Sequence, residues 1–250
     1  MRASPYMNKL RAVVLLAVLA GAAPARADIL PFFTTGPGAP SIDRKQWYVS
    51  DGWRNGDWQN CQWTAHNVFA ASASALELRL DKNGGKISPY GCGEIQYMPK
   101  TSYGTYAASL RTAAGSGLNT AFFTYIGPPM GTPQHDEIDF EFMGKAPDTV
   151  DITVWTNEDS HGKAARVPLG FDASKAFHTY SFKWTPDAVL FYADDKLIFR
   201  TQPGETIPSH PGHLFFSLWS GGKAEDEWMG PFTYTAPATA YVAWAKFTPL

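Results

Sequence analysis

The sequence is short of the residue types that mark the commonest metal sites. Among its 250 residues there are two cysteines and six histidines, and none falls into a ligand spacing such as CxxC or HExxH. Charged residues make up 18% of the chain, and they form no basic tail, heptad array or internal repeat. We therefore expect no metal site and no cofactor, and neither a coiled coil nor a solenoid.

The longest apolar run stands at the N-terminus. It covers residues 12–20, follows three basic residues and precedes the A-x-A cleavage signature Ala25-Arg26-Ala27. Such a run is shorter than the roughly 20 apolar residues needed to span a bilayer. The pattern predicts a signal peptide over residues 1–27 and a secreted or periplasmic mature protein. An uncleaved membrane anchor is the weaker alternative.

Charge excludes two classes of partner. Removal of residues 1–27 takes away four basic residues and no acidic one, so the formal charge changes from −2 to −6. A mildly acidic exported protein is a poor candidate for binding nucleic acid or an anionic membrane. We expect neither partner, and we expect a monomer.

The two cysteines are Cys61 and Cys92. An even number in an exported chain indicates one disulfide, which would stabilise the fold by roughly 2–4 kcal/mol. Two free buried thiols are the alternative.

Short strand-like runs, separated by frequent turn signals, fill the rest of the chain. Leu76, Leu78 and Leu80 alternate with polar residues in the first of them. Similar runs follow at 103–112, 119–126, 136–143, 150–157, 178–184, 188–194, 196–201, 213–219 and 241–247. Residues 28–40 predict an extended N-terminal arm, and only 172–177 has a helical pattern. We therefore predict one all-β domain over 41–250, a two-sheet antiparallel β-jelly-roll sandwich.

One strand carries an unusual row of acids, in the segment HDEIDFEFMG at 135–144. Side chains alternate along a strand, so Glu137, Asp139 and Glu141 share one face while apolar residues occupy the other. Like charges on one sheet face repel each other. A glycosidase can use that repulsion, because it needs one ionised and one protonated carboxyl group at its working pH. An accidental acidic strand is the alternative.

The spacing needs side chains that lean together. Positions i and i+4 of a strand are about 13 Å apart at roughly 3.3 Å per residue. The carboxyl groups of a retaining glycosidase lie only about 5–5.5 Å apart. A curved strand would bring Glu137 and Glu141 closer, with Asp139 between them.

The ExDxE segment at 137–141 resembles the active-site motif of glycoside hydrolase family sixteen, in the form found in bacterial lichenases. Further segments are similar to lichenases in the same order, namely 50–63, 91–97, 121–129, 169–184 and 217–230. The resemblance implies a concanavalin-like jelly roll with a sugar cleft on its concave face, and a β-linked polysaccharide as substrate. It also implies that Glu137 is the nucleophile, Glu141 the general acid/base and Asp139 an assisting residue. Cys61 and Cys92 match the cysteines of the lichenase disulfide.

The same resemblance implies contacts to the sugar. The expected substrate-binding residues are Trp53, Asn55, Glu94, Gln96, Phe123, His135, Trp155 and Trp219. Three of these residues have an alternative role: Trp155 and Trp219 could fill the core instead, and His135 could be structural.

Some positions depart from the lichenase pattern. Gln96 stands in place of an arginine, Thr153 and Ser217 each in place of an asparagine, and His135 in place of a tryptophan. Ala243 replaces the aspartate of the family's structural calcium site, which makes calcium doubtful. These departures resemble the endoglycanases that trim exopolysaccharides such as succinoglycan. The sequence therefore predicts a retaining endo-β-glycanase acting on β-1,3-1,4-glucan or on such an exopolysaccharide.

Three other functions stay open. A transglycosylase of the same family would keep the chemistry and pass the glycosyl unit to another sugar. A lectin-like sandwich would bind glycans without cutting them, although it has no use for the acidic row. A structural envelope protein is the remotest reading.

Overall fold

Two antiparallel sheets account for most of the chain in the computed structural model, which describes residues 28–34, 40–71, 75–127, 132, 134–157, 159 and 164–250. The predicted signal peptide, residues 1–27, lies outside the described residues. Among the described residues no helix has the length and apolar character needed to cross a bilayer. The predicted all-β jelly-roll sandwich is confirmed.

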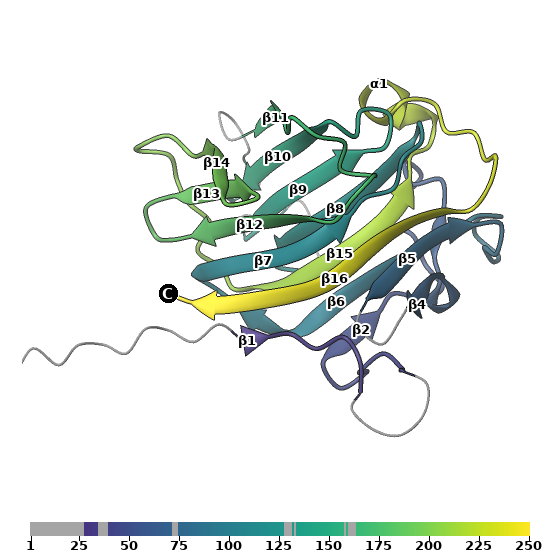
Figure 1. The fold of residues 1–250 in the computed structure, drawn as a ribbon, viewed down its shortest axis with the longest axis horizontal. Helices are drawn as coiled ribbons and strands as arrows, with labels where there is room; N and C mark the ends of the chain where they lie inside the picture. Colours follow the sequence, from purple (N-terminus) through teal and green to yellow (C-terminus); the bar gives the residue numbers. More distant parts are fainter. Residues whose placement is uncertain are drawn as a thin grey trace, which may run out of the picture.

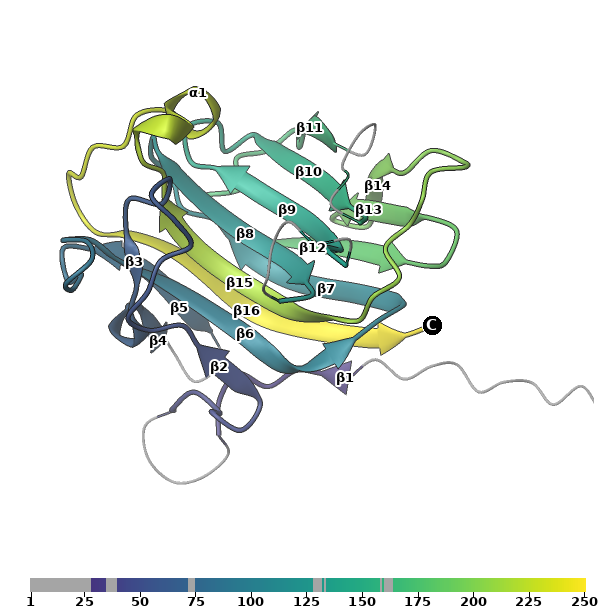
Figure 2. The same cartoon turned by 180° about the vertical axis from the view of Figure 1, so that it is seen from behind.

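The first sheet carries the acidic row and is seen in front in Figure 2. Its strands, in spatial order, are β11 (Ala164–Pro168), β10 (Thr149–Trp155), β9 (Glu137–Met143), β8 (Leu118–Tyr125), β15 (Gly212–Ser220), β6 (Gly91–Thr101) and β2 (Trp47–Val49). Every neighbouring pair in it is antiparallel.

The second sheet faces the viewer in Figure 1. Its order is β5 (Leu76–Asp81), β16 (Ala238–Pro249), β7 (Gly104–Arg111), β12 (His178–Trp184), β13 (Val189–Ala193) and β14 (Lys196–Arg200). Strands β1 (Asp28–Ile29), β3 (Gln62–Trp63) and β4 (Val68–Ala70) pair with β16, β6 and β5. Strand β6 joins the two sheets, because Cys92 pairs with β5 while Gly93 and later residues pair with β15.

The core lies between the sheets and fixes the orientation of β9. Ile138, Phe140 and Phe142 are fully buried on the inner face of that strand. Phe140 packs edge-on against Phe191 of the second sheet, with ring centroids 5.0 Å apart. Because strand side chains alternate, burial of this face directs the three acids to the outer face of the first sheet.

The N-terminal arm contributes to the core. Its described part is extended, and Leu30 and Phe32 are each only 4% exposed. The Phe32 ring lies 4.9 Å from that of Trp47 on β2. The arm therefore closes one end of the sandwich instead of lying apart from it.

The helix predicted at 172–177 is wrong, since these residues form turns. The Asp172 carboxylate accepts hydrogen bonds from the backbone N–H and the hydroxyl of Ser174, at 2.9 and 2.5 Å. Such local side-chain bonds compete with helix formation. The helical turns instead occur at η1 (Ala65–Asn67), η2 (Lys223–Glu225) and α1 (Asp226–Met229).

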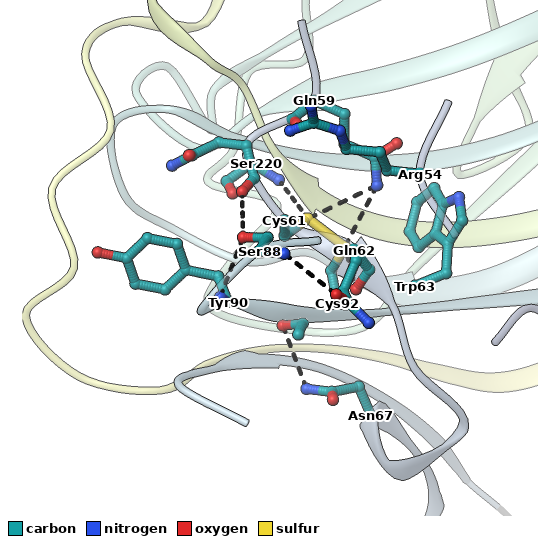
Figure 3. The surroundings of a disulfide bond; sticks show 12 residues. Arg54, Gln59, Cys61, Gln62, Trp63, Asn67, Ser88, Tyr90, Cys92 and Ser220 are labelled. Carbon is teal, nitrogen blue, oxygen red and sulfur yellow. Dashed lines mark hydrogen bonds between the residues drawn. A yellow bond between two sulfur atoms is a disulfide. The ribbon is translucent and has the colours of Figure 1, made fainter. Parts of the chain in front are cut away.

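Cys61 and Cys92 form the predicted disulfide, and both are fully buried. The Gln59 amide nitrogen lies 3.4 Å from the sulfur of Cys92, and the Ser220 N–H donates to the sulfur of Cys61 at 3.4 Å (Figure 3). The bridge therefore ties the loop before β3 to β6 and to the end of β15.

We predict that the double variant Cys61→Ser/Cys92→Ser is less stable by about 2–4 kcal/mol, because the unfolded chain regains the entropy that the cross-link removes. Chemical denaturation of the variant and of wild type under non-reducing conditions measures this. Since the bridged loop also forms a wall of the cleft described below, KM should rise as well. Equal stability of the two proteins would contradict the prediction.

Candidate active site

The acids of β9 meet in one cavity. Glu137, Asp139 and Glu141 all line a cavity of about 570 Å³ on the outer face of the first sheet. The residues of β8 that pair with these acids have small or aromatic side chains. Ala121 of β8 lies opposite Glu141, and Phe123 lies opposite Asp139. The predicted gathering of the three carboxyl groups on one face therefore occurs.

Six of the eight expected sugar-contacting residues line the same cavity, namely Trp53, Asn55, Glu94, Gln96, Phe123 and Trp219. They come from three places: the loop after β2, strand β6, and the paired strands β8 and β15. This arrangement is a half-open groove with aromatic walls and a carboxyl-lined floor, the kind of surface that suits a pyranose ring.

The other two expected residues lie elsewhere. His135 is 1% exposed, and its ring is stacked on that of Trp155 with centroids 5.3 Å apart. Trp155 is half-buried on β10, directly across from Glu137 and outside the cavity lining. A direct contact of either residue with a sugar stays a prediction.

Sequence reasoning missed several cavity residues, among them Tyr48, Trp58, Lys100, Tyr125, His213 and Phe215. His213, Phe215, Ser217 and Trp219 are spaced two residues apart and share one face of β15. Strand alternation could therefore have identified His213 and Phe215. Trp58 could not be found in this way, because it lies in an irregular loop. Its ring meets that of Trp219 edge-on, with centroids 5.1 Å apart.

Asp139 is set apart electrostatically. Burial, followed by the charges of Glu137 and Glu141, raises the pKa of Asp139 well above its ordinary value. Its carboxyl group is also hydrogen-bonded to Glu137. The raised pKa favours the protonated form of Asp139, which can donate a hydrogen bond to the Glu137 carboxylate.

Glu141 holds its proton at neutral pH. Burial raises its pKa to about 8, while a hydrogen bond from Asn119 opposes the shift. The Asn119 amide donates to Oε1 of Glu141 at 2.9 Å, and Asn119 is fully buried on β8. Sequence reasoning missed Asn119 as well, although it shares one face of the strand with Ala121 and Phe123.

A second carboxylate lies beside Glu141 on the next strand. Asp151 of β10 is the register partner of Glu141, and its charge adds to the rise in the pKa of Glu141. Arg166 binds Asp151 through two hydrogen bonds, at 2.6 and 2.8 Å, and the Trp228 indole N–H donates to it at 2.8 Å. These partners hold the Asp151 carboxylate in place.

Glu94 forms the opposite side of the cavity floor. It is buried, and burial raises its pKa to about 7 against a smaller opposing effect of Ser50. The Ser50 hydroxyl donates to Oε1 of Glu94 at 2.6 Å. Near neutral pH this carboxyl group can therefore donate or accept a hydrogen bond toward a bound hydroxyl.

Comparison with known proteins assigns the family. The family model described as Glycosyl hydrolases family 16 matches residues 55–246, which include the whole acidic strand. The chain belongs to glycosyl hydrolase family 16. The enzyme is therefore a glycoside hydrolase, as the sequence predicted.

Curated relatives of this family 16 enzyme extend over most of its length. The endo-1,3-1,4-beta-glycanase ExoK of Rhizobium meliloti is 39% identical over 209 residues, covering 83% of this chain and 76% of ExoK. A beta-glucanase of Bacillus subtilis is 37% identical over 203 residues, 81% of each chain.

Solved structures of lichenases share the fold. A β-1,3-1,4-glucanase from a mouse hindgut metagenome superposes with a TM-score of 0.79 at 32% identity, covering 90% of this chain and 99% of that one. The Bacillus licheniformis beta-glucanase gives a TM-score of 0.77 at 33% identity, with 91% and 99% coverage.

We predict that Asp151→Asn lowers the pKa of Glu141 in the family 16 enzyme. The exchange removes a neighbouring negative charge and leaves the Arg166 guanidinium without its ionic partner, and both changes favour the ionised form of Glu141. The sequence predicts that Glu141 is the general acid, which must hold its proton, so activity should be lost at a lower pH than in wild type. The measurement is the alkaline limb of the pH dependence of kcat.

Asp187→Asn is the matched control. It makes the same change of charge in the exposed turn between β12 and β13, and the alkaline limb should not move. An unshifted limb in Asp151→Asn, or a shift in the opposite direction, would show that Asp151 does not influence Glu141.

Proposed function

We propose that the enzyme is a retaining endo-β-glycanase that cleaves internal β-glucosidic bonds, in β-1,3-1,4-glucan or in a β-glucan-type exopolysaccharide such as succinoglycan. The observation that carries this proposal is the shared cavity of Glu137, Asp139 and Glu141, in which Asp139 is bonded to Glu137. Its aromatic walls and the relatives named as glycanases support a polymeric β-glucan as substrate.

The proposed reaction is a double displacement. Glu141 gives its proton to the leaving glycosidic oxygen while a Glu137 oxygen attacks the anomeric carbon, forming a glycosyl ester. Glu141, now ionised, takes a proton from water as that water attacks the anomeric carbon. The ester bond breaks, Glu137 is released as a carboxylate, and Glu141 is protonated again. The net charge of the site is therefore the same before and after each step.

The raised pKa values of the neighbouring acids support these roles. The raised pKa of Glu141, about 8, keeps the acid protonated at neutral pH. The pKa of Asp139 is raised as well, which favours its protonated form and a hydrogen bond from it to the Glu137 carboxylate. The apolar and aromatic surroundings strengthen all of these interactions.

We also propose that the protein acts outside the cytoplasm, as a monomer, after removal of residues 1–27. The basic and apolar leader with its A-x-A site supports export. A buried disulfide suits an oxidising compartment.

A substrate panel tests the function. Lichenan, laminarin, xyloglucan, agarose and succinoglycan are each incubated with the secreted protein and with Glu137→Gln, and products are counted as reducing ends and sized. We expect wild type to release short oligosaccharides from lichenan or succinoglycan, and Glu137→Gln to lose at least about 10³-fold of that rate, since no ester can form. Binding without release would favour a lectin, and products longer than the substrate would favour a transglycosylase.

We predict that Glu141→Ala loses about 10²- to 10⁴-fold of its activity on polysaccharide, the usual contribution of a general acid. On an aryl β-glycoside with a good leaving group, added azide or formate should restore part of the rate, because the first step no longer needs a proton donor. The product with azide should be a β-glycosyl azide, which NMR identifies. Failure of both anions to restore any rate would count against Glu141 as the acid/base.

A further inference from the structure

His135 touches the nucleophile and not the cavity. Its Nε2 lies 2.7 Å from Oε2 of Glu137. The imidazole is 1% exposed and is absent from the cavity lining, whereas the side chain of Glu137 is 19% exposed and belongs to it. A sugar in the cavity would therefore contact Glu137, and His135 would act on the sugar only through Glu137.

Aromatic side chains of two strands hold the imidazole in this position. Its ring is stacked on Trp155 of β10 and meets the edge of Tyr125 of β8, with centroids 5.3 and 5.4 Å apart. Trp155 and Tyr125 are the two register partners of Glu137 itself. The same neighbours that position the nucleophile on the sheet thus also position the imidazole beside it.

The backbone around His135 is fixed as well. The adjacent residue Asp136 is buried, and its carboxylate accepts N–H bonds from Asn157 at 3.0 Å and Ser209 at 2.7 Å. The His135 N–H donates to the carbonyl of Thr132 at 2.9 Å. The segment that enters β9 is therefore pinned on both sides.

The contact has a clear chemical use. An ionised carboxylate only accepts hydrogen bonds, so the imidazole must donate its Nε2 proton to Oε2 when Glu137 is the nucleophile. Such a charge-assisted bond favours the ionised form and limits rotation of the carboxylate. With Oε2 held by this bond, the orientation of the carboxylate toward the anomeric carbon is fixed. Attack from a fixed direction is where orientation lowers a barrier most.

We propose that His135 is a positioning residue for the nucleophile: its Nε2–H holds Oε2 of Glu137, so that the carboxylate is presented to the sugar in one orientation. This inference rests on the proposed function, because it needs Glu137 to attack an anomeric carbon. This role differs from the direct sugar contact that the resemblance led us to expect of His135.

The chain offers a matched control on its opposite sheet. His178 of β12 makes the same kind of contact, with Nδ1 2.7 Å from Oδ2 of Asp194 and its ring stacked on Phe171 at 3.6 Å. The two histidines therefore share ring stacking and a carboxylate partner. Only His135 has the nucleophile as that partner, so only its loss should affect the chemical step.

The test compares His135→Phe, His135→Gln and His178→Phe with wild type on the glucan that the panel identifies and on an aryl β-glycoside. His135→Phe keeps an aromatic ring against Trp155 but has no donor, and kcat should fall about 10- to 100-fold while KM changes less than about twofold. The fall should be the same on the activated substrate, since the attack and not the leaving group is impaired. Glutamine carries an amide N–H at a reach similar to Nε2, so His135→Gln should recover most of kcat.

His178→Phe should lower the melting temperature and leave kcat unchanged. Should His135→Phe fail to fold, His135→Asn replaces it, because its shorter amide does not reach Glu137.

Several outcomes would overturn the inference. These are an unchanged kcat in His135→Phe or His135→Asn, a loss that lies in KM alone, a loss that disappears on the aryl substrate, or an equal loss of kcat in His178→Phe. A wild-type protein that releases no reducing ends from any glucan would instead overturn the proposed function together with this inference. Failure of the inference alone is seen as an active wild type with an equally active His135 variant.

Discussion

The buried apolar face of β9 determines where its acids point. Phe140 and Phe142 are enclosed between the two sheets, and a shift of register by one residue would bring them out and take the carboxyl groups in. Such a shift would bury several carboxyl groups against aromatic rings, which is far less favourable than the repulsion among three acids on a partly hydrated face. Packing of the core therefore holds the three carboxyl groups close together despite their mutual repulsion.

The crowding of the three acids can give them different protonation preferences, because each acid has different neighbours. Asp139 is enclosed by the two glutamates, whereas Glu141 is bonded to Asn119 and faces the fixed charge of Asp151. Glu137 receives one hydrogen bond from its neighbour in the row, Asp139, and one from His135 outside the row. Burial and neighbouring charge therefore leave Glu137 as the member of the row best supplied with donors.

The sequence was informative wherever strand alternation or the family resemblance applied. It predicted the face shared by Glu137, Asp139 and Glu141, and the resemblance identified Phe123 and Trp219 as cavity residues. Strand alternation depends on regular spacing, so it failed where the chain is irregular, and the resemblance identified Trp53 and Asn55 in the irregular loop but not Trp58. Trp58 lies in a loop whose path is set by the disulfide and by pairing of Gln59 with Gly221.

His135 and 172–177 show the same limit in different ways. His135 precedes its strand by two residues, and its burial depends on Trp155 and Tyr125, which approach from two other strands. At 172–177 the Asp172 carboxylate satisfies the backbone locally and produces turns. In both cases contacts made by particular side chains, and not the period of the sequence, decide the structure.

The origin of the cavity walls explains why chemistry and polymer preference can be separated in this fold. The acids proposed as catalytic stand on β9, with hydrogen bonds from Asn119 of β8 and His135 of the segment before β9, and with the charge of Asp151 beside them on β10. Trp53, Asn55 and Trp58 instead come from the loop held by the disulfide, and Glu94 and Gln96 from β6. Exchanges in the loop or on β6 therefore leave the charge row unaltered while they change which hydroxyl groups and ring faces the groove accepts. Two departures from the lichenase pattern, Gln96 on β6 and Ser217 on β15, line the cavity away from β9, so we expect them to influence which polymer is bound and not how its bond is broken.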